Sequence, residues 1–165
     1  LGGTVTGIDA GQENVQTAIV HAQQAGLDIE YRCILPEALA ADGRAFDVVL
    51  NMEVVEHVPD LDAFLDASCH LVKPGGMMVA ATLNRTLKAL ALAKFGAEYV
   101  LGWLPRGTHN WRKFVRPSEF VRGLRPHGVE VVELKGVSYS PLANAWALSR
   151  DLDVNYLVFA VKEEE

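Results

Sequence analysis

Short apolar runs alternate with amphipathic segments along the chain. Runs with the β-branched composition of buried strands occupy residues 4–9, 29–34, 46–50 and 77–83. Between them, apolar side chains at three- and four-residue spacing predict helices over residues 15–25 and 61–71. This alternation is typical of an α/β fold in which helices cover both faces of a doubly wound, mostly parallel sheet.

The last third of the chain continues this pattern. Pro117 and Ser118 predict the start of a helix that runs to about residue 124, and strands are expected at residues 129–134 and 153–161. Residues 136–150 between these strands read as a long connection. Such connections often form binding loops, although a loop held by its own aromatic side chains is as consistent with the sequence.

Length, charge and cysteine content limit the function classes. The 165 residues fit one domain, and half of them are apolar, so the chain can bury a sizeable core. A net charge of −6 argues against a general nucleic-acid-binding protein, which would carry a basic face. Cys33 and Cys69 lie in apolar stretches and are expected to be buried free thiols in a reducing compartment.

The candidate active site follows the predicted strand at residues 46–50. Met52 lies at the carboxyl end of this strand, where open α/β sheets bind their ligands. Glu53, Glu56 and His57 come next, and on a helical turn their spacing would place all three side chains on one face. They could bind a divalent metal, or His57 could act as a general base. A solvated turn with a packed His57 is the alternative.

Asp9 ends the first predicted strand. Nucleotide-binding α/β folds place at this point a carboxylate that accepts hydrogen bonds from ribose hydroxyls. The alternative is that Asp9 or Asn14 caps the helix that follows.

Residues 84–105 differ in composition from the rest of the chain. They combine a surplus of apolar side chains with basic residues near the start, and charges interrupt the apolar run too often for a membrane span. The segment could cover the active site, lie in a membrane interface, or pack as ordinary core. Residues 106–116 add basic and aromatic side chains that could meet anionic headgroups or a substrate carboxylate.

Several motifs in this order resemble those of the bacterial ubiquinone-biosynthesis O-methyltransferases, over essentially the whole chain. Features shared with class I S-adenosylmethionine-dependent methyltransferases in general are Asp9, Glu56-His-Val58 and Lys73-Pro-Gly-Gly76. Features that point to this family are Gly96-Ala-Glu-Tyr99, Gly107-Thr-His109 and Asp153-Val-Asn-Tyr156. The resemblance implies a Rossmann-like sheet with an antiparallel last strand, in a single domain over residues 1–165 with an inserted lid or membrane-contact segment at about 84–116.

The same resemblance implies an activity. The enzyme would move a methyl group from S-adenosylmethionine to a phenolic hydroxyl of polyprenylated catechol-type intermediates, at the two O-methylation steps of ubiquinone biosynthesis. It would be cytoplasmic and peripherally associated with the inner membrane. Its expected partners are the polyprenylated substrate, anionic membrane lipids and other ubiquinone-biosynthesis enzymes, and no nucleic acid is expected.

The resemblance also assigns roles to the candidate residues. Asp9 would hold the ribose hydroxyls of the cofactor, and Met52 would contact the cofactor. Glu53, Glu56 and His57 would hold a divalent metal such as Mg²⁺, which could bind the catechol-type oxygens and lower the pKa of the attacking hydroxyl. Without a metal, His57 is the general-base candidate.

One feature departs from the family. In the family, a glycine-rich cofactor motif lies on the strand and turn before the residue equivalent to Asp9. This sequence starts after that motif, at Leu1. The strand concerned is the centre of the class I sheet, between the strands predicted at residues 4–8 and 46–50. We therefore expect that Leu1 is not the biological start, and that this chain alone is inactive and lacks useful cofactor affinity. Micromolar binding of S-adenosylhomocysteine in a calorimetric titration would contradict this expectation.

Two other functions stay open from the sequence. The chain could belong to a class I methyltransferase of another small molecule, in which residues 84–105 are only a lid. It could instead be a non-catalytic adaptor that keeps the fold and binds a lipid or a biosynthetic partner.

Overall fold

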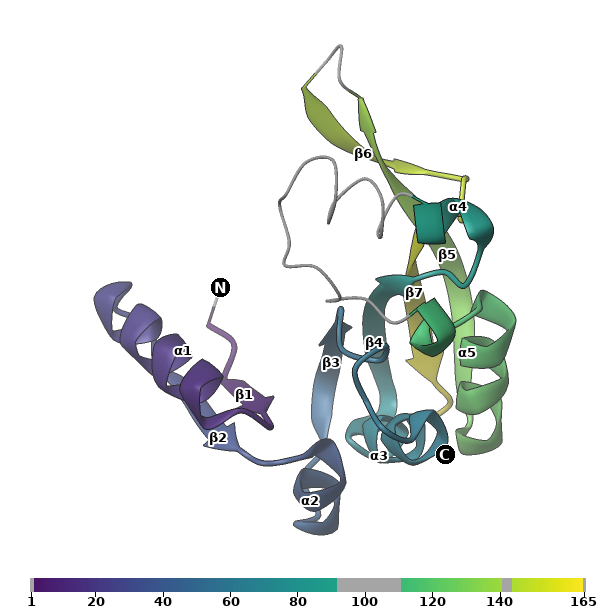
Figure 1. Cartoon of the computed structure of the whole chain (residues 1–165). Coiled ribbons are helices and arrows are strands. Elements are labelled where there is room, and N and C mark those ends of the chain that lie inside the picture. The colour runs from purple at the N-terminus through teal and green to yellow at the C-terminus, as the bar shows by residue number, and fades with distance from the viewer. Residues whose placement is uncertain (1, 92–110, 141–143, 165) are drawn as a thin grey trace. The chain divides into compact units, whose positions relative to one another are not determined.

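The computed structural model describes residues 2–91, 111–140 and 144–164 of the chain. These residues form two compact units, Leu1–Arg44 and Ala45–Glu165, each with its own sheet (Figure 1). Strands and helices alternate in both units, so the predicted α/β class is confirmed. The expectation of a single domain over residues 1–165 stays a prediction.

The first unit is the βαβ arrangement that the sequence predicted, followed by a short helix. In chain order its elements are β1 (Val5–Asp9), α1 (Gln12–Gln24), β2 (Ile29–Cys33) and α2 (Pro36–Ala41). Strands β1 and β2 are parallel, and Val15 and Ala22 are the buried residues of α1. The chain leaves α1 through Gly26, whose positive φ of 64° suits glycine.

The second unit carries the larger sheet. In chain order its elements are β3 (Phe46–Met52), α3 (Leu61–His70), β4 (Val72–Leu83), α4 (Leu87–Leu90), η2 (Trp111–Lys113), α5 (Pro117–Leu124), η3 (Arg125–His127), β5 (Val129–Ser140), β6 (Ala145–Ser149) and β7 (Asn155–Lys162). The strand order is β3-β4-β7-β5-β6. Strands β3 and β4 are parallel, whereas β7 runs antiparallel to both of its neighbours, β4 and β5. The antiparallel last strand is therefore confirmed.

Helices α3 and α5 form the core of the second unit together with the central strands. Phe64 and Leu65 of α3 and Phe120 and Leu124 of α5 are almost fully buried in one cluster with residues of β4, β5 and β7. A Cβ atom at Gly123 of α5 would overlap the terminal methyl of Leu65, so a larger residue at this position would force the Leu65 side chain to shift. Such burial stabilises a domain by roughly 1.5–3 kcal/mol per large apolar side chain.

Strand β3 does not match the prediction of a strand buried on both faces. Val48, Leu50 and Met52 are exposed by 47%, 64% and 52%. They alternate with Val49 and Asn51, which face the core of the unit. Within the second unit, α3 and α5 cover only the face to which Val49 and Asn51 point, so this apolar strand is half exposed there.

The predicted long connection at residues 136–150 is largely a hairpin. Strand β5 continues to Ser140, and β6 pairs with it from Gly136↔Ser149 to Ser140↔Ala145. The rings of Tyr139 and Trp146 lie on neighbouring strands, with their centroids 5.1 Å apart. Cross-strand aromatic pairs of this kind stabilise a sheet. The signal that the loop interpretation missed was the period-two spacing of Val137 and Tyr139 on one strand and of Trp146 and Leu148 on the other.

One of the two cysteines differs from expectation. Cys69 is buried as predicted, and burial raises the pKa of its thiol to about 12. Cys33, in contrast, is exposed at the end of β2, and its Sγ lies 3.6 Å from the carbonyl oxygen of Ala10. The prediction for Cys33 was wrong because an apolar stretch of sequence does not specify which face of an edge strand is covered.

Candidate functional site

The chain leaves β3 through a tight turn and not through a helical one. Glu53 has a left-handed φ of 53°, and its backbone N–H donates to the carbonyl of Ala81 on β4 at 2.9 Å. The backbone N–H of His57 then donates to the carbonyl of Val54 at 3.0 Å. A left-handed residue at Glu53 breaks the helical spacing. The three predicted metal ligands therefore do not share one helical face.

Glu53 and Glu56 nevertheless lie together. Glu56 is only 4% exposed, and its Oε2 accepts a 2.8 Å hydrogen bond from the Oγ1 of Thr82, a fully buried residue of β4. Its side chain is also hydrogen-bonded to that of Glu53. Although Glu53 as a residue is exposed, desolvation of its carboxyl group, followed by the charge of Glu56 and their hydrogen bond, raises the pKa of Glu53 to about 7.

This carboxyl pair can hold either a proton or a cation. Two carboxylates in contact repel each other when both are ionised, so one of them keeps a proton to a higher pH than usual. Carboxylate oxygens are also the ligands that Mg²⁺ prefers, and a divalent ion would remove the repulsion that the proton otherwise relieves. The pair formed by Glu53 and Glu56 therefore fits a hard divalent cation.

His57 is not gathered with these carboxylates. Its side chain is exposed in the turn. One group of three potential metal ligands occurs in the described part of the chain, with ligand atoms that all lie within 4.8 Å of one another. That group is on α3 and η3 and does not include Glu53, Glu56 or His57. The structure thus brings together two of the three residues that the sequence singled out at this turn.

Asn51 is a polar residue of this strand end to which the sequence analysis assigned no role. It is 8% exposed, and its Nδ2 has no hydrogen-bond partner among the described residues. A buried donor without a partner costs about 1–3 kcal/mol, so Asn51 is a candidate to donate to a bound ligand. An amide at the end of an apolar strand was the signal in the sequence. Met52, beside it, is half exposed and accessible to a cofactor.

Asp9 belongs to the first unit, at the end of β1. Its Oδ1 accepts hydrogen bonds from the backbone N–H of Gly11 at 2.7 Å and from Nδ2 of Asn14 at 3.0 Å. These bonds fix the carboxylate beside the start of α1. The capping alternative was wrong, because the N-cap residue of α1 is Gly11 and no side chain caps the helix. The Oδ2 atom has no hydrogen-bond partner among the described residues, and Asp9 is exposed. One oxygen therefore remains available for a ligand hydroxyl.

Most of the predicted lid or membrane-contact segment, residues 92–110, lies outside the described residues. The described residues before and after it are tied to the second unit. Arg85 forms an ion pair with Glu119 of α5, and Trp111 donates from Nε1 to the carbonyl of Thr86 at 2.9 Å.

Lys88, on α4, also forms ion pairs within the second unit. Its Nζ lies 2.6 Å from the carboxylate of Asp151 and 3.3 Å from that of Asp153. Basic side chains at the start of the segment are thus paired within the protein. Among the described helices, none has the length and apolar composition needed to span a bilayer.

Comparisons with known proteins place these observations in a family context. A model of the methyltransferase domain matches residues 1–80. The ubiquinone biosynthesis O-methyltransferase of Brucella anthropi is 58% identical over 160 residues, which cover 97% of this chain and 64% of that protein. The protein of the same name from Parvibaculum lavamentivorans is 54% identical over 165 residues, covering 100% of this chain and 65% of that protein. The chain thus spans less than two thirds of the length of these relatives.

A solved structure supports the fold. The magnesium protoporphyrin IX methyltransferase of Synechocystis PCC 6803, determined with bound S-adenosylhomocysteine, matches with a TM-score of 0.69 and 17% identity. The match covers 98% of this chain and 65% of that one. At this identity the likeness concerns the fold alone, and it confirms the Rossmann-like architecture expected of class I methyltransferases.

Proposed function

The chain is homologous to the ubiquinone biosynthesis O-methyltransferases and carries a methyltransferase domain, and on this basis we propose that it forms part of an enzyme with that activity. The enzyme would methylate a phenolic hydroxyl of polyprenylated catechol-type intermediates at two O-methylation steps. The observation that carries the proposal is identity of 54–58% along 97–100% of the chain.

S-adenosylmethionine is the methyl donor in this proposal. When bound, it would supply an electrophilic methyl group. Asp9 would accept hydrogen bonds from the ribose hydroxyls through Oδ2, while Gly11 and Asn14 hold Oδ1 in place. Met52 would contact the cofactor at the end of β3, and the exposure of its side chain supports this role.

A divalent metal, for which Mg²⁺ is the best match, is proposed at Glu53 and Glu56. The support is the raised pKa of Glu53, because a carboxyl pair that shares a proton near neutral pH gains by exchanging it for a divalent ion. When bound, the ion would lower the pKa of the substrate hydroxyl. His57 would complete the site as a third ligand, after its exposed side chain turns toward the pair. In a metal-free reaction, His57 would accept the hydroxyl proton instead.

Peripheral association with the cytoplasmic side of the inner membrane is part of the same proposal. A polyprenylated substrate lies in the bilayer, so the enzyme has to reach the membrane surface. Arg112, Lys113 and Arg116 are exposed on and directly after η2, where they could meet anionic lipid headgroups. Other ubiquinone-biosynthesis enzymes are further proposed partners.

The decisive experiment is transfer of a labelled methyl group from S-adenosylmethionine to a polyprenylated catechol in vesicles. The assay requires the natural full-length protein, whose length is established beforehand by intact-mass measurement and N-terminal sequencing. We expect methylation of the vesicle-borne catechol. Methylation of water-soluble phenols alone would instead support a different methyltransferase, and cofactor binding without turnover on any catechol would support the adaptor.

Membrane association has its own test. Flotation with vesicles that contain anionic lipids should recover the protein, and rising salt should release it, because electrostatic attraction to headgroups is screened. A protein that never floats with such vesicles would contradict this part of the proposal and leave the chemistry open to the assay above.

A further inference from the structure

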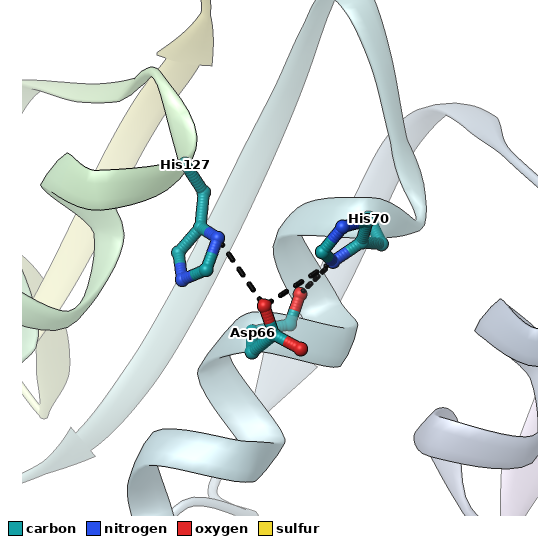
Figure 2. A group of neighbouring side chains, drawn as sticks. All are labelled: Asp66, His70 and His127. Atoms are coloured by element: carbon teal, nitrogen blue, oxygen red, sulfur yellow. Dashed lines mark hydrogen bonds and ion pairs between the residues drawn. The ribbon is translucent and has the colours of Figure 1, made fainter.

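A second cluster of ligand-type side chains lies away from the turn that follows β3. Asp66 and His70 occupy the last two turns of α3, and His127 comes from η3, in the same unit (Figure 2). One ligand atom from each residue lies within 4.8 Å of the other two. Figure 2 shows the carboxylate of Asp66 between the two imidazole rings. The cluster takes no part in the proposed methyl transfer.

Two distances within the cluster match the edges of a tetrahedral metal centre, and one ligand atom of each histidine lies within 4.8 Å of the other. Oδ1 of Asp66 lies 3.4 Å from Nδ1 of His70 and 3.3 Å from Nδ1 of His127. Bonds of about 2.0–2.1 Å from Zn²⁺ to nitrogen and oxygen, set at tetrahedral angles, separate neighbouring ligand atoms by about 3.3–3.4 Å. The Asp66 oxygen and each imidazole nitrogen therefore already stand one tetrahedral edge apart.

The surroundings of the cluster favour a cation that solvent can reach. The carbonyl end of α3 carries partial negative charge, and a positive ion beside the last turn interacts favourably with it. The side chains of His70 and Asp66 are exposed by 62% and 52%, and that of His127 by 25%. An ion could enter from solvent, and a fourth coordination position would remain open.

Ion pairing or hydrogen bonding alone is the competing explanation. Nδ1 of His70 lies 2.9 Å from the backbone carbonyl of Asp66, so this imidazole already has a partner within its helix. A metal on Nδ1 would replace that hydrogen bond. Exposed ion pairs contribute little to stability, so ion pairs give only a weak reason for two histidines to meet one carboxylate. The two explanations predict different responses to metal ions.

We propose that Asp66, His70 and His127 form a transition-metal site, with Zn²⁺ as the ion that fits best. Two imidazoles and one carboxylate suit Zn²⁺ better than Mg²⁺ or Ca²⁺, which prefer oxygen ligands throughout. The bound ion would fasten the end of α3 to the turn that leads into β5. This site is independent of the proposed methyltransferase activity and of the oxygen-rich pair Glu53 and Glu56.

The test is calorimetric titration of the full chain with ZnCl₂, alongside the absorption spectrum of the Co²⁺-substituted protein. The titrated protein carries Glu53→Gln and Glu56→Gln, so that the other proposed site does not contribute. We expect one ion per chain and the intense visible bands of tetrahedral Co²⁺. Asp66→Asn, His70→Gln and His127→Gln should each weaken binding by about tenfold or more.

His21→Gln is the matched control, because His21 is an exposed helical histidine of the first unit. It should leave Zn²⁺ affinity unchanged. Thermal unfolding gives a second readout, since Zn²⁺ should raise the midpoint of the parent and of His21→Gln but not that of His70→Gln. His70 is largely exposed, so this variant should fold. Absence of Zn²⁺ binding, or equal binding by all variants, would overturn the proposal and leave ion pairs only.

Discussion

Glu53 and Glu56 meet in a partly desolvated turn against β4, whereas Asp66, His70 and His127 meet on the surface where α3 ends. In the first group, the buried hydroxyl of Thr82 donates a hydrogen bond to Glu56, and desolvation raises the pKa of Glu53. The second is open to solvent and combines two imidazoles with a single carboxylate. Burial of like charges thus favours a shared proton, which in our proposal a hard cation replaces, while the exposed mixed cluster is proposed to bind a softer metal.

The largest effect is expected from removing the first group in the active enzyme. If a divalent ion binds there, Glu53→Ala and His57→Ala should each abolish the dependence of turnover on Mg²⁺ and lower turnover by roughly 10²-fold. Steady-state rates over a range of Mg²⁺ concentrations measure both quantities. His70→Gln should change neither. Retention of the Mg²⁺ dependence in both site variants would remove the metal from this turn.

Removing the hydrogen bond from Thr82 to Glu56 should lower the stability of the fold. Thr82→Val takes away the hydroxyl that donates to Glu56 at 2.8 Å and leaves a buried carboxyl group without this bond. We expect a loss of about 1–3 kcal/mol in the free energy of unfolding, measured in urea. Thr17→Val, at an exposed position of α1, is the control and should cost less than about 0.5 kcal/mol. Equal losses in both variants would mean that the hydrogen bond to Glu56 is unimportant.

The pH dependence of stability offers a finer distinction. The pKa of Glu53 is raised from its ordinary 4.5 to about 7 in the folded state, so between these values the folded chain binds more protons than the unfolded one. The protonated carboxyl group of Glu53 therefore contributes to the free energy of unfolding fully below about pH 4.5, and this contribution is lost as the pH rises through 7. Urea unfolding of the parent and of Glu53→Gln at a series of pH values should show a decline across this window that the variant lacks. Parallel curves would contradict the raised pKa.

The smallest effect is expected at the surface cluster in metal-free buffer. With a chelator present, His70→Gln should change the free energy of unfolding by less than about 1 kcal/mol, because exposed ion pairs contribute little. Urea unfolding with and without Zn²⁺ measures this, with His21→Gln as the reference. A large loss in the presence of chelator would show that the ion pairs themselves hold α3 to η3.

The contrast also shows what a sequence can reveal. Helices α1, α3 and α5 were predicted because their apolar spacing and end residues are local signals. At the start of α3, for example, the side chain of Asp60 accepts a hydrogen bond from the backbone N–H of Ala63. The proximity of Glu53 and Glu56 agrees with the prediction, although the helical turn on which that prediction rested is absent. The shape of their turn did not, because the backbone of Glu53 is fixed by a hydrogen bond to Ala81 on another strand.

Contacts between distant segments account for the remaining differences. His127 reaches Asp66 only because α5 and η3 pack against α3, and no local pattern encodes that contact. The exposure of Leu50 on β3 has the same origin, since coverage of a strand face depends on where later helices pack. A sequence therefore shows which side chains can do chemistry more readily than which of them meet.

The place of β7 has a consequence for how the protein is made. This strand comes last in the order of the second unit, yet it lies between β4 and β5 and pairs with both. During translation, β4 and β5 leave the ribosome with facing edges that have nothing to pair with until Asn155–Lys162 follows. The central pairing of this sheet therefore has to form after nearly the whole unit has been synthesised. Until then, the nascent chain exposes unpaired strand edges, to which chaperones can bind and through which chains can aggregate.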